Sequence, residues 1–176
     1  IDLRKREATL QLLWIGIGSI CMFFAGLTSI IFVDKMQFPE VPSWFMYSTI
    51  AILFSSILLI FTKKRIRKDK PIFMTISIVF LLGLFFAYCQ FKGWGQLISN
   101  DIYFSGGTKE SSLLYVLTGA HLAHLFAGLI ALLITTINTK RNRYSSGNYL
   151  GLELFSHYWH FLTLLWLYIF VFLKYL

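Results

Sequence analysis

Apolar residues fill five long stretches of this chain, and short polar connectors separate the stretches. Each stretch is about 20 residues or longer, enough for a helix rising about 1.5 Å per residue to cross a hydrocarbon core of roughly 30 Å. Backbone polar groups in lipid need partners within the protein, so a single helical bundle is expected. The pattern predicts an all-α polytopic membrane protein with one transmembrane domain over residues 1–176. The five expected spans run from about 9–33, 43–62, 71–93, 111–137 and 152–175.

Small residues and prolines add detail at two places. Gly18 and Gly26 lie in the first stretch with Met22 between them, and small residues let helices approach closely in lipid. This face of the first span is therefore expected to pack against another helix. Pro39 and Pro42 are expected to end one helix and start the next.

The composition agrees with a membrane protein. Hydrophobic residues make up 57% and charged residues 14% of the chain, which differs from ordinary soluble domains. The sequence starts at Ile1. No signal peptide is expected, because the basic leader runs into a full-length span without a small-residue cleavage site. Cys21 and Cys89 fall in separate spans and are expected to be buried, reduced thiols.

The formal net charge of +8 is distributed unevenly. Basic residues precede the first span and fill the connectors after the second and fourth, whereas few lie on the opposite side. The first group contains Arg4, Lys5, Arg6, Lys63, Lys64, Arg65, Arg67, Lys68, Lys70, Lys140, Arg141 and Arg143, and the second contains Lys35, Lys92, Lys109 and Lys174. The positive-inside rule then predicts a cytoplasmic N-terminus and a periplasmic C-terminus. Anionic lipid headgroups, and not nucleic acid, are the expected partner of the basic connector.

Two of the apolar stretches carry histidines. His121 and His124 lie three residues apart in TGAHLAHLFAG, beside a seam of small residues. In the last stretch Glu153, His157 and His160 fall at i, i+4 and i+7, hence on one helix face. An imidazole in hydrocarbon needs hydrogen-bond partners, so both helices are expected to turn these residues toward protein.

Three chemistries are compatible with these residues. One histidine from each helix could ligate a haem b, although histidines at i and i+3 cannot bind opposite sides of one iron. Glu153 and the histidines could instead form a proton relay. The third chemistry is a structural polar seam or lipid cleft, formed by His121, His124, Glu153, His157, Trp159, His160 and Trp166.

The chain carries no residue set that predicts an active site of its own. It lacks the histidines for a haem and copper pair, a cysteine cluster for dinuclear copper, a phosphate loop and paired carboxylates. The sequence therefore predicts no catalytic residue, no metal ligand and no cofactor-binding residue in this chain.

Several motifs, in this order, resemble subunit III of the haem-copper terminal oxidases, such as cytochrome c oxidase. MFFAG at 22–26 resembles the start of the family's five-helix core, and Gln90 with Trp94 is similar to its glutamine–tryptophan block. The TG-x-H-x-x-H and E…YWHF…W motifs of the family match Thr118, Gly119, His121, His124, Glu153, Tyr158, Trp159, His160, Phe161 and Trp166. The resemblance covers nearly the whole chain, in the shorter five-helix form.

The resemblance implies a noncatalytic subunit III of a bacterial aerobic terminal oxidase in the inner membrane. Such a subunit flanks and stabilises the catalytic subunit I, beside subunit II and other oxidase subunits, and binds phospholipid. It is also associated with dioxygen access. Haem and copper are then expected in the partner subunits. Two alternatives remain, a haem b-binding electron-transfer anchor and the companion subunit of a quinol oxidase or nitric oxide reductase. The electron donor and membership of a respiratory supercomplex stay open.

Three positions depart from the family's pattern. Ile20, Gly93 and Thr163 stand where the family often has acidic residues. A proton-handling role that needs those carboxylates loses support, whereas a structural role does not depend on them. Glu153 is then the one carboxylate expected near the histidines.

Overall fold

The computed structural model describes residues 3–34, 38, 40–68, 70–105, 107–141, 144 and 149–175. They form five α-helices: α1 (Leu3–Asp34), α2 (Ser43–Ile66), α3 (Phe73–Ser99), α4 (Lys109–Lys140) and α5 (Leu150–Tyr175). All five are long and apolar enough to cross a membrane. The prediction of an all-α protein with five spans is confirmed. Most of the helices extend past the expected apolar stretch, because polar residues continue their first or last turns.

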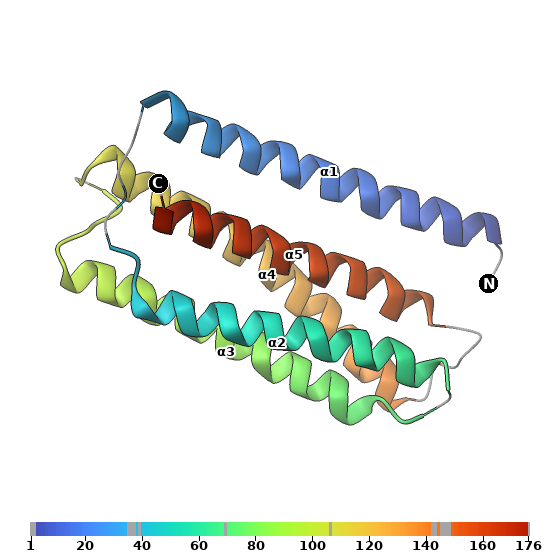
Figure 1. The fold of residues 1–176 in the computed structure, drawn as a ribbon. Helices are drawn as coiled ribbons and strands as arrows, with labels where there is room; N and C mark the ends of the chain where they lie inside the picture. The colour runs from blue at the N-terminus through green and yellow to red at the C-terminus, as the bar shows by residue number, and fades with distance from the viewer. Residues whose placement is uncertain are drawn as a thin grey trace.

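Consecutive helices run antiparallel, so the two termini lie at opposite ends of the bundle (Figure 1). α2 to α5 pack together, and α1 lies along the side formed by α5 and α4. The start of α1, the end of α2 and the start of α5 share one end, which is where the basic connectors of the sequence fall. Lys35, Pro39 and Arg143 lie outside the described residues, so the expectations placed on them are untested.

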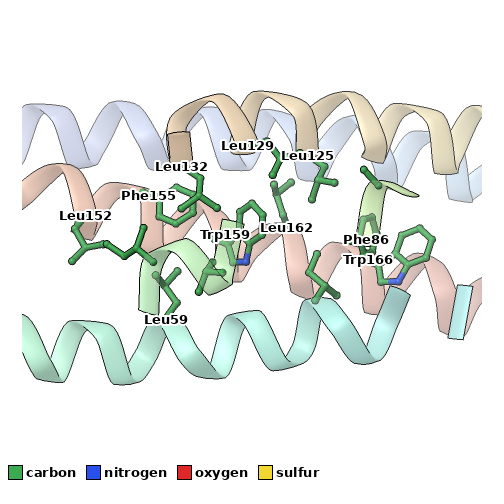
Figure 2. Close-up of a cluster of buried hydrophobic side chains, with 14 of the residues drawn as sticks. Leu59, Phe86, Leu125, Leu129, Leu132, Leu152, Phe155, Trp159, Leu162 and Trp166 are labelled. Atoms are coloured by element: carbon green, nitrogen blue, oxygen red, sulfur yellow. The ribbon is translucent and has the colours of Figure 1, made fainter. Parts of the chain in front are cut away.

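The core is built around two tryptophans of α5. Trp159 and Trp166 are fully buried, and aliphatic and aromatic side chains from α2, α3 and α4 surround them (Figure 2). Phe86 of α3 lies edge-on against Trp166, with ring centroids 5.0 Å apart. Lipid tails are as apolar as these side chains, so close packing and hydrogen bonds must hold the helices together.

The first helix is the least covered. In the apolar 18-residue segment of α1, 11% of the residues are buried, against 39–44% in the corresponding segments of the other helices. A Cβ added at Gly18 or Gly26 meets no atom within 4 Å, and Met22 is 79% exposed. The prediction that this face packs against another helix was therefore wrong within the described part of the chain. α1 instead turns Phe24 and Ile31 inward, because these larger side chains complete an apolar cluster with α4 and α5.

The two cysteines differ in environment. Both are free, and Cys89 is buried in α3 as expected. Cys21 is exposed, contrary to prediction, because it lies on a side of α1 that no other described helix covers.

Two glycines of α3 let aromatic rings reach the helix backbone. A Cβ at Gly93 would overlap the ring of Phe45 from α2, and one at Gly83 would lie 2.8 Å from both Leu129 and Trp159. Position 93 therefore has no room for an acidic side chain. The departure from the family's pattern at this position is explained by packing.

Gly93→Ala is expected to destabilise the protein by about 1–3 kcal/mol, the usual cost of overpacking a filled space. Gly95→Ala is the matched control, since Gly95 lies on the same helix and an added Cβ there meets no atom within 4 Å. Thermal denaturation of the two purified variants measures the difference. Equal melting temperatures would contradict the close approach of Phe45 to the α3 backbone.

Candidate functional site

The seven side chains expected to form one polar seam contact different neighbours. Trp159, His160 and Trp166, in the middle part of α5, contact α2. His121 of α4 contacts α3 and α5. His124, Glu153 and His157 contact α1 or their own helix. The structure therefore spreads these side chains over several helix–helix interfaces, and only His121 and Trp166 contact each other across two of the groups among the described residues.

Hydrogen bonds from two indoles join α5 to α2. Trp159 Nε1 donates to Ser55 Oγ and Trp166 Nε1 donates to Thr49 Oγ1, both at 2.9 Å. Each hydroxyl also donates to a backbone carbonyl of its own helix, which leaves its oxygen lone pairs to accept the indole proton. The acceptors lie about two turns apart on α2 and the donors about two turns apart on α5, so the antiparallel helices match in register.

Each acceptor has a second hydroxyl beside it that contacts another polar side chain. Ser56 Oγ lies 2.5 Å from His160 Nδ1, and Ser48 Oγ accepts from Gln90 Nε2 at 2.9 Å. The apolar pattern of α2 did not predict these partners. The signal that could have revealed them is a pair of adjacent hydroxyl residues repeated after two turns of an otherwise apolar helix, opposite two tryptophans with the same spacing.

His121 of α4 is buried between aromatic rings of α3 and α5. Its ring centroid is 5.7 Å from that of Phe86 and 5.2 Å from that of Trp166, and the side chain is fully buried. Neither ring nitrogen has a hydrogen-bond partner among the described residues. One turn earlier on α4, Thr118 Oγ1 accepts from Trp94 Nε1 at 3.1 Å and joins α4 to α3.

An ion pair holds the start of α1 against α5. The guanidinium of Arg6 lies 2.8 Å from the carboxylate of Glu153, whose side chain is 14% exposed. The backbone carbonyl of Glu153 contacts His157 Nδ1 at 2.8 Å. The carboxylate that the sequence placed near the histidines is therefore directed toward α1.

Three further contacts fasten α1 along its length. Trp14 lies edge-on to His157 with ring centroids 6.0 Å apart, and Phe24 lies edge-on to His124 at 5.9 Å. Tyr168 Oη donates to the hydroxyl of a buried threonine of α1, Thr28, at 2.9 Å. Polar or aromatic contacts therefore follow α1 from one end of the bundle to the other.

Two of the histidines are oriented by bonds within their own helices. His124 Nδ1 lies 2.7 Å from the Ala120 carbonyl, one turn earlier, as His157 Nδ1 does with its own helix. Among the described residues, no three histidine, cysteine or acidic side chains form a group that could hold a metal ion. Buried hydrogen bonds and the Arg6–Glu153 ion pair join neighbouring helices in this arrangement.

A largely apolar cavity of about 360 Å³ lies between α1, α4 and α5, toward the end where Arg6 meets Glu153. Leu13, Ile134 and Phe155 supply apolar walls. A space of this kind fits hydrocarbon better than a polar ligand.

A second cavity, of about 440 Å³, lies at the opposite end beside the connector before α4. Tyr103 Oη donates to the Asp101 carboxylate there at 3.2 Å, and this bond raises the pKa of the phenol. Ser111 Oγ donates to the Tyr103 carbonyl at 3.0 Å, so the connector is tied to the first turn of α4.

Comparison with known proteins places this architecture in a family. The family model of cytochrome c oxidase subunit III matches residues 19–176. Cytochrome c oxidase subunit 3 of Corynebacterium diphtheriae is 23% identical over 169 residues, covering 85% of this chain and 79% of that protein. The protein of the same name from Spodoptera frugiperda is 27% identical over 149 residues, covering 82% and 92%. A probable cytochrome c oxidase subunit 3 of Rickettsia felis is 32% identical over 108 residues, covering 60% and 37%.

The match covers the second half of α1 and all of α2 to α5. It therefore includes every motif on which the resemblance was based, and the resemblance is confirmed. Five helices able to span a membrane, in a family with bacterial members, agree with the expected multi-pass bacterial membrane protein. The chain belongs to the cytochrome c oxidase subunit III family.

Proposed function

We propose that this chain is the noncatalytic subunit III of a bacterial aerobic haem-copper terminal oxidase. It flanks and stabilises the catalytic subunit I, beside subunit II and other oxidase subunits, which carry the haem and copper. The observation that carries the proposal is the family match over residues 19–176, nearly the whole of the chain. The N-terminus lies in the cytoplasm and the C-terminus in the periplasm.

The distribution of charge supports this orientation. Basic residues occupy the last turn of α2 and the last turn of α4, and three more open α1. Because consecutive helices run antiparallel, these segments share one end of the bundle. Basic residues favour the cytoplasmic side of a membrane, which supports a cytoplasmic location for that end.

A supporting role fits the way in which the bundle uses its polar side chains. Trp159, Trp166 and Glu153 all bind side chains of neighbouring helices, and each bond fixes the relative position of two helices. The positions where the family often has acids are packed instead. Ile20 lies against the apolar cluster between α1 and α5, and Thr163 Oγ1 donates to a carbonyl of its own helix at 2.9 Å.

The cavity between α1, α4 and α5 supports the binding of lipid. Its apolar walls could hold an acyl chain, and the basic residues at the same end could contact a phosphate headgroup. Dioxygen is apolar and dissolves in such a volume, so the same space could support its passage toward the catalytic subunit.

Copurification tests the oxidase assignment. A tagged form of this chain, extracted in mild detergent, is expected to bring down a haem-copper subunit I. The isolated chain is expected to be colourless. If the chain comes down without such a subunit and shows a Soret band that His124→Ala abolishes, it is a haem b-binding anchor instead. The visible spectrum of the intact complex, with or without copper A, separates a cytochrome c oxidase from a quinol oxidase or a nitric oxide reductase.

Trp159→Phe is expected to lower the stability of the bundle by about 1 kcal/mol or more, because Ser55 loses its donor while the ring is largely kept. Trp44→Phe is the matched control, since Trp44 has ring contacts with Tyr47 and Tyr88 but no hydrogen bond from its indole among the described residues. Melting temperature and yield of the purified complex are the measurements. Equal effects of the two variants would argue against the indole–hydroxyl bond as a determinant of pairing.

Glu153→Ala is expected to reduce the yield of assembled complex while leaving oxygen consumption per haem nearly unchanged, because Arg6 loses its partner at the α1–α5 interface. Arg6→Ala should reduce the yield in the same way, and the yield of the double variant should be no lower than that of either single variant. The opposite pattern, normal yield with collapsed turnover, would favour a proton relay through Glu153.

A further inference from the structure

Gln90 of α3 and His121 of α4 are fully buried polar side chains with unpaired atoms. Both are 0% exposed, and within the part of the chain that the structure describes, Gln90 Oε1 and both nitrogens of His121 have no hydrogen-bond partner. A buried polar group without a partner carries a free-energy penalty, and surrounding lipid offers no donor or acceptor. These three atoms therefore point to a ligand that the described side chains do not supply.

The packing of α3 against α4 places the two side chains near each other. Phe86, Gln90 and Trp94 follow one another at intervals of four residues on one face of α3. Phe86 contacts His121, with ring centroids 5.7 Å apart, and Trp94 bonds to Thr118, one turn before His121. Gln90 lies between Phe86 and Trp94 on α3, about 6 Å along that helix from the residue that contacts His121.

Contacts with α2 and α5 bring the same two residues to one place. Gln90 Nε2 donates to Ser48 Oγ, and Trp166 Nε1 donates to Thr49 Oγ1, the next residue of α2. The ring of Trp166 in turn lies 5.2 Å from that of His121. Side chains from four helices thus converge around Gln90 and His121.

We propose that ordered water binds at this convergence and bridges Gln90 to His121. A neutral imidazole has one donor and one acceptor nitrogen, whereas an amide oxygen only accepts. One water accepts the imidazole N–H and donates to Gln90 Oε1, through two hydrogen bonds of about 2.8 Å each. A second water donates to the other ring nitrogen. The hydration site joins α3 to α4 in the middle of the bundle and does not depend on the role of the complex.

A cryo-electron microscopy map of the native assembly tests the proposal directly. Density for water between the Gln90 amide and the His121 ring is expected at a resolution that shows ordered water elsewhere in the same helices. Continuous side-chain packing without such density would overturn the proposal. This test needs no variant, so it remains decisive even if substitutions at these positions prevent assembly.

Coupling between the two residues gives a second test. Gln90→Leu and His121→Leu should each lower the melting temperature of the assembly by several degrees, because each leaves the bridging water short of a partner. The melting temperature of the double variant should fall by much less than the sum of the two single decreases. Gln90→Leu combined with His124→Leu is the matched control and should be additive, because His124 contacts its own helix and α1. Additive losses in both pairs would overturn the bridge.

Discussion

A buried indole N–H inside a membrane is removed from bulk water and lipid offers it no acceptor, so the bundle depends on how α5 meets this requirement. Its two fully buried tryptophans donate to hydroxyls of α2, and the spacing of donors and acceptors allows one register of the antiparallel pair. Slippage by one turn would leave both indoles without acceptors and the hydroxyls without donors. In a medium where apolar contacts with lipid and with protein are similar in strength, this difference selects the native pairing.

The positions of α3 and α4 follow from the same rings. Gly83 allows α3 to approach the edge of Trp159, while Phe86 and His121 pack against Trp166 from α3 and α4. A larger residue at position 83 would push α3 away from Trp159. Buried hydrogen bonds thus fix α5 on α2, and close packing then fixes α3 and α4 on α5.

The sequence predicted the number and order of the helices because an apolar run long enough to span lipid is a local property. It also predicted that the histidine helices face protein. It could not predict that His121 and His124 contact different helices, because three residues on a helix are about 300° of rotation and only the neighbours decide what each side chain meets. The prediction that the glycine face of α1 packs against another helix was wrong for a related reason. Small residues permit close approach, but they do not require it when larger residues on another face, such as Phe24, fill the interface.

The sparse burial of α1 is compatible with a firm attachment because its contacts are spread over the thickness of the membrane. Arg6 binds α5 near one end of α1. Thr28, which lies 22 residues after Arg6, accepts a hydrogen bond from Tyr168 of α5. At about 1.5 Å per residue this separation is roughly 33 Å, close to the thickness of the hydrocarbon core. Two polar contacts at such a distance fix both the tilt and the rotation of the helix, and Trp14 and Phe24 fill the space between them. The glycine face is then free to meet lipid or a neighbouring subunit without weakening the hold of α1 on its own bundle.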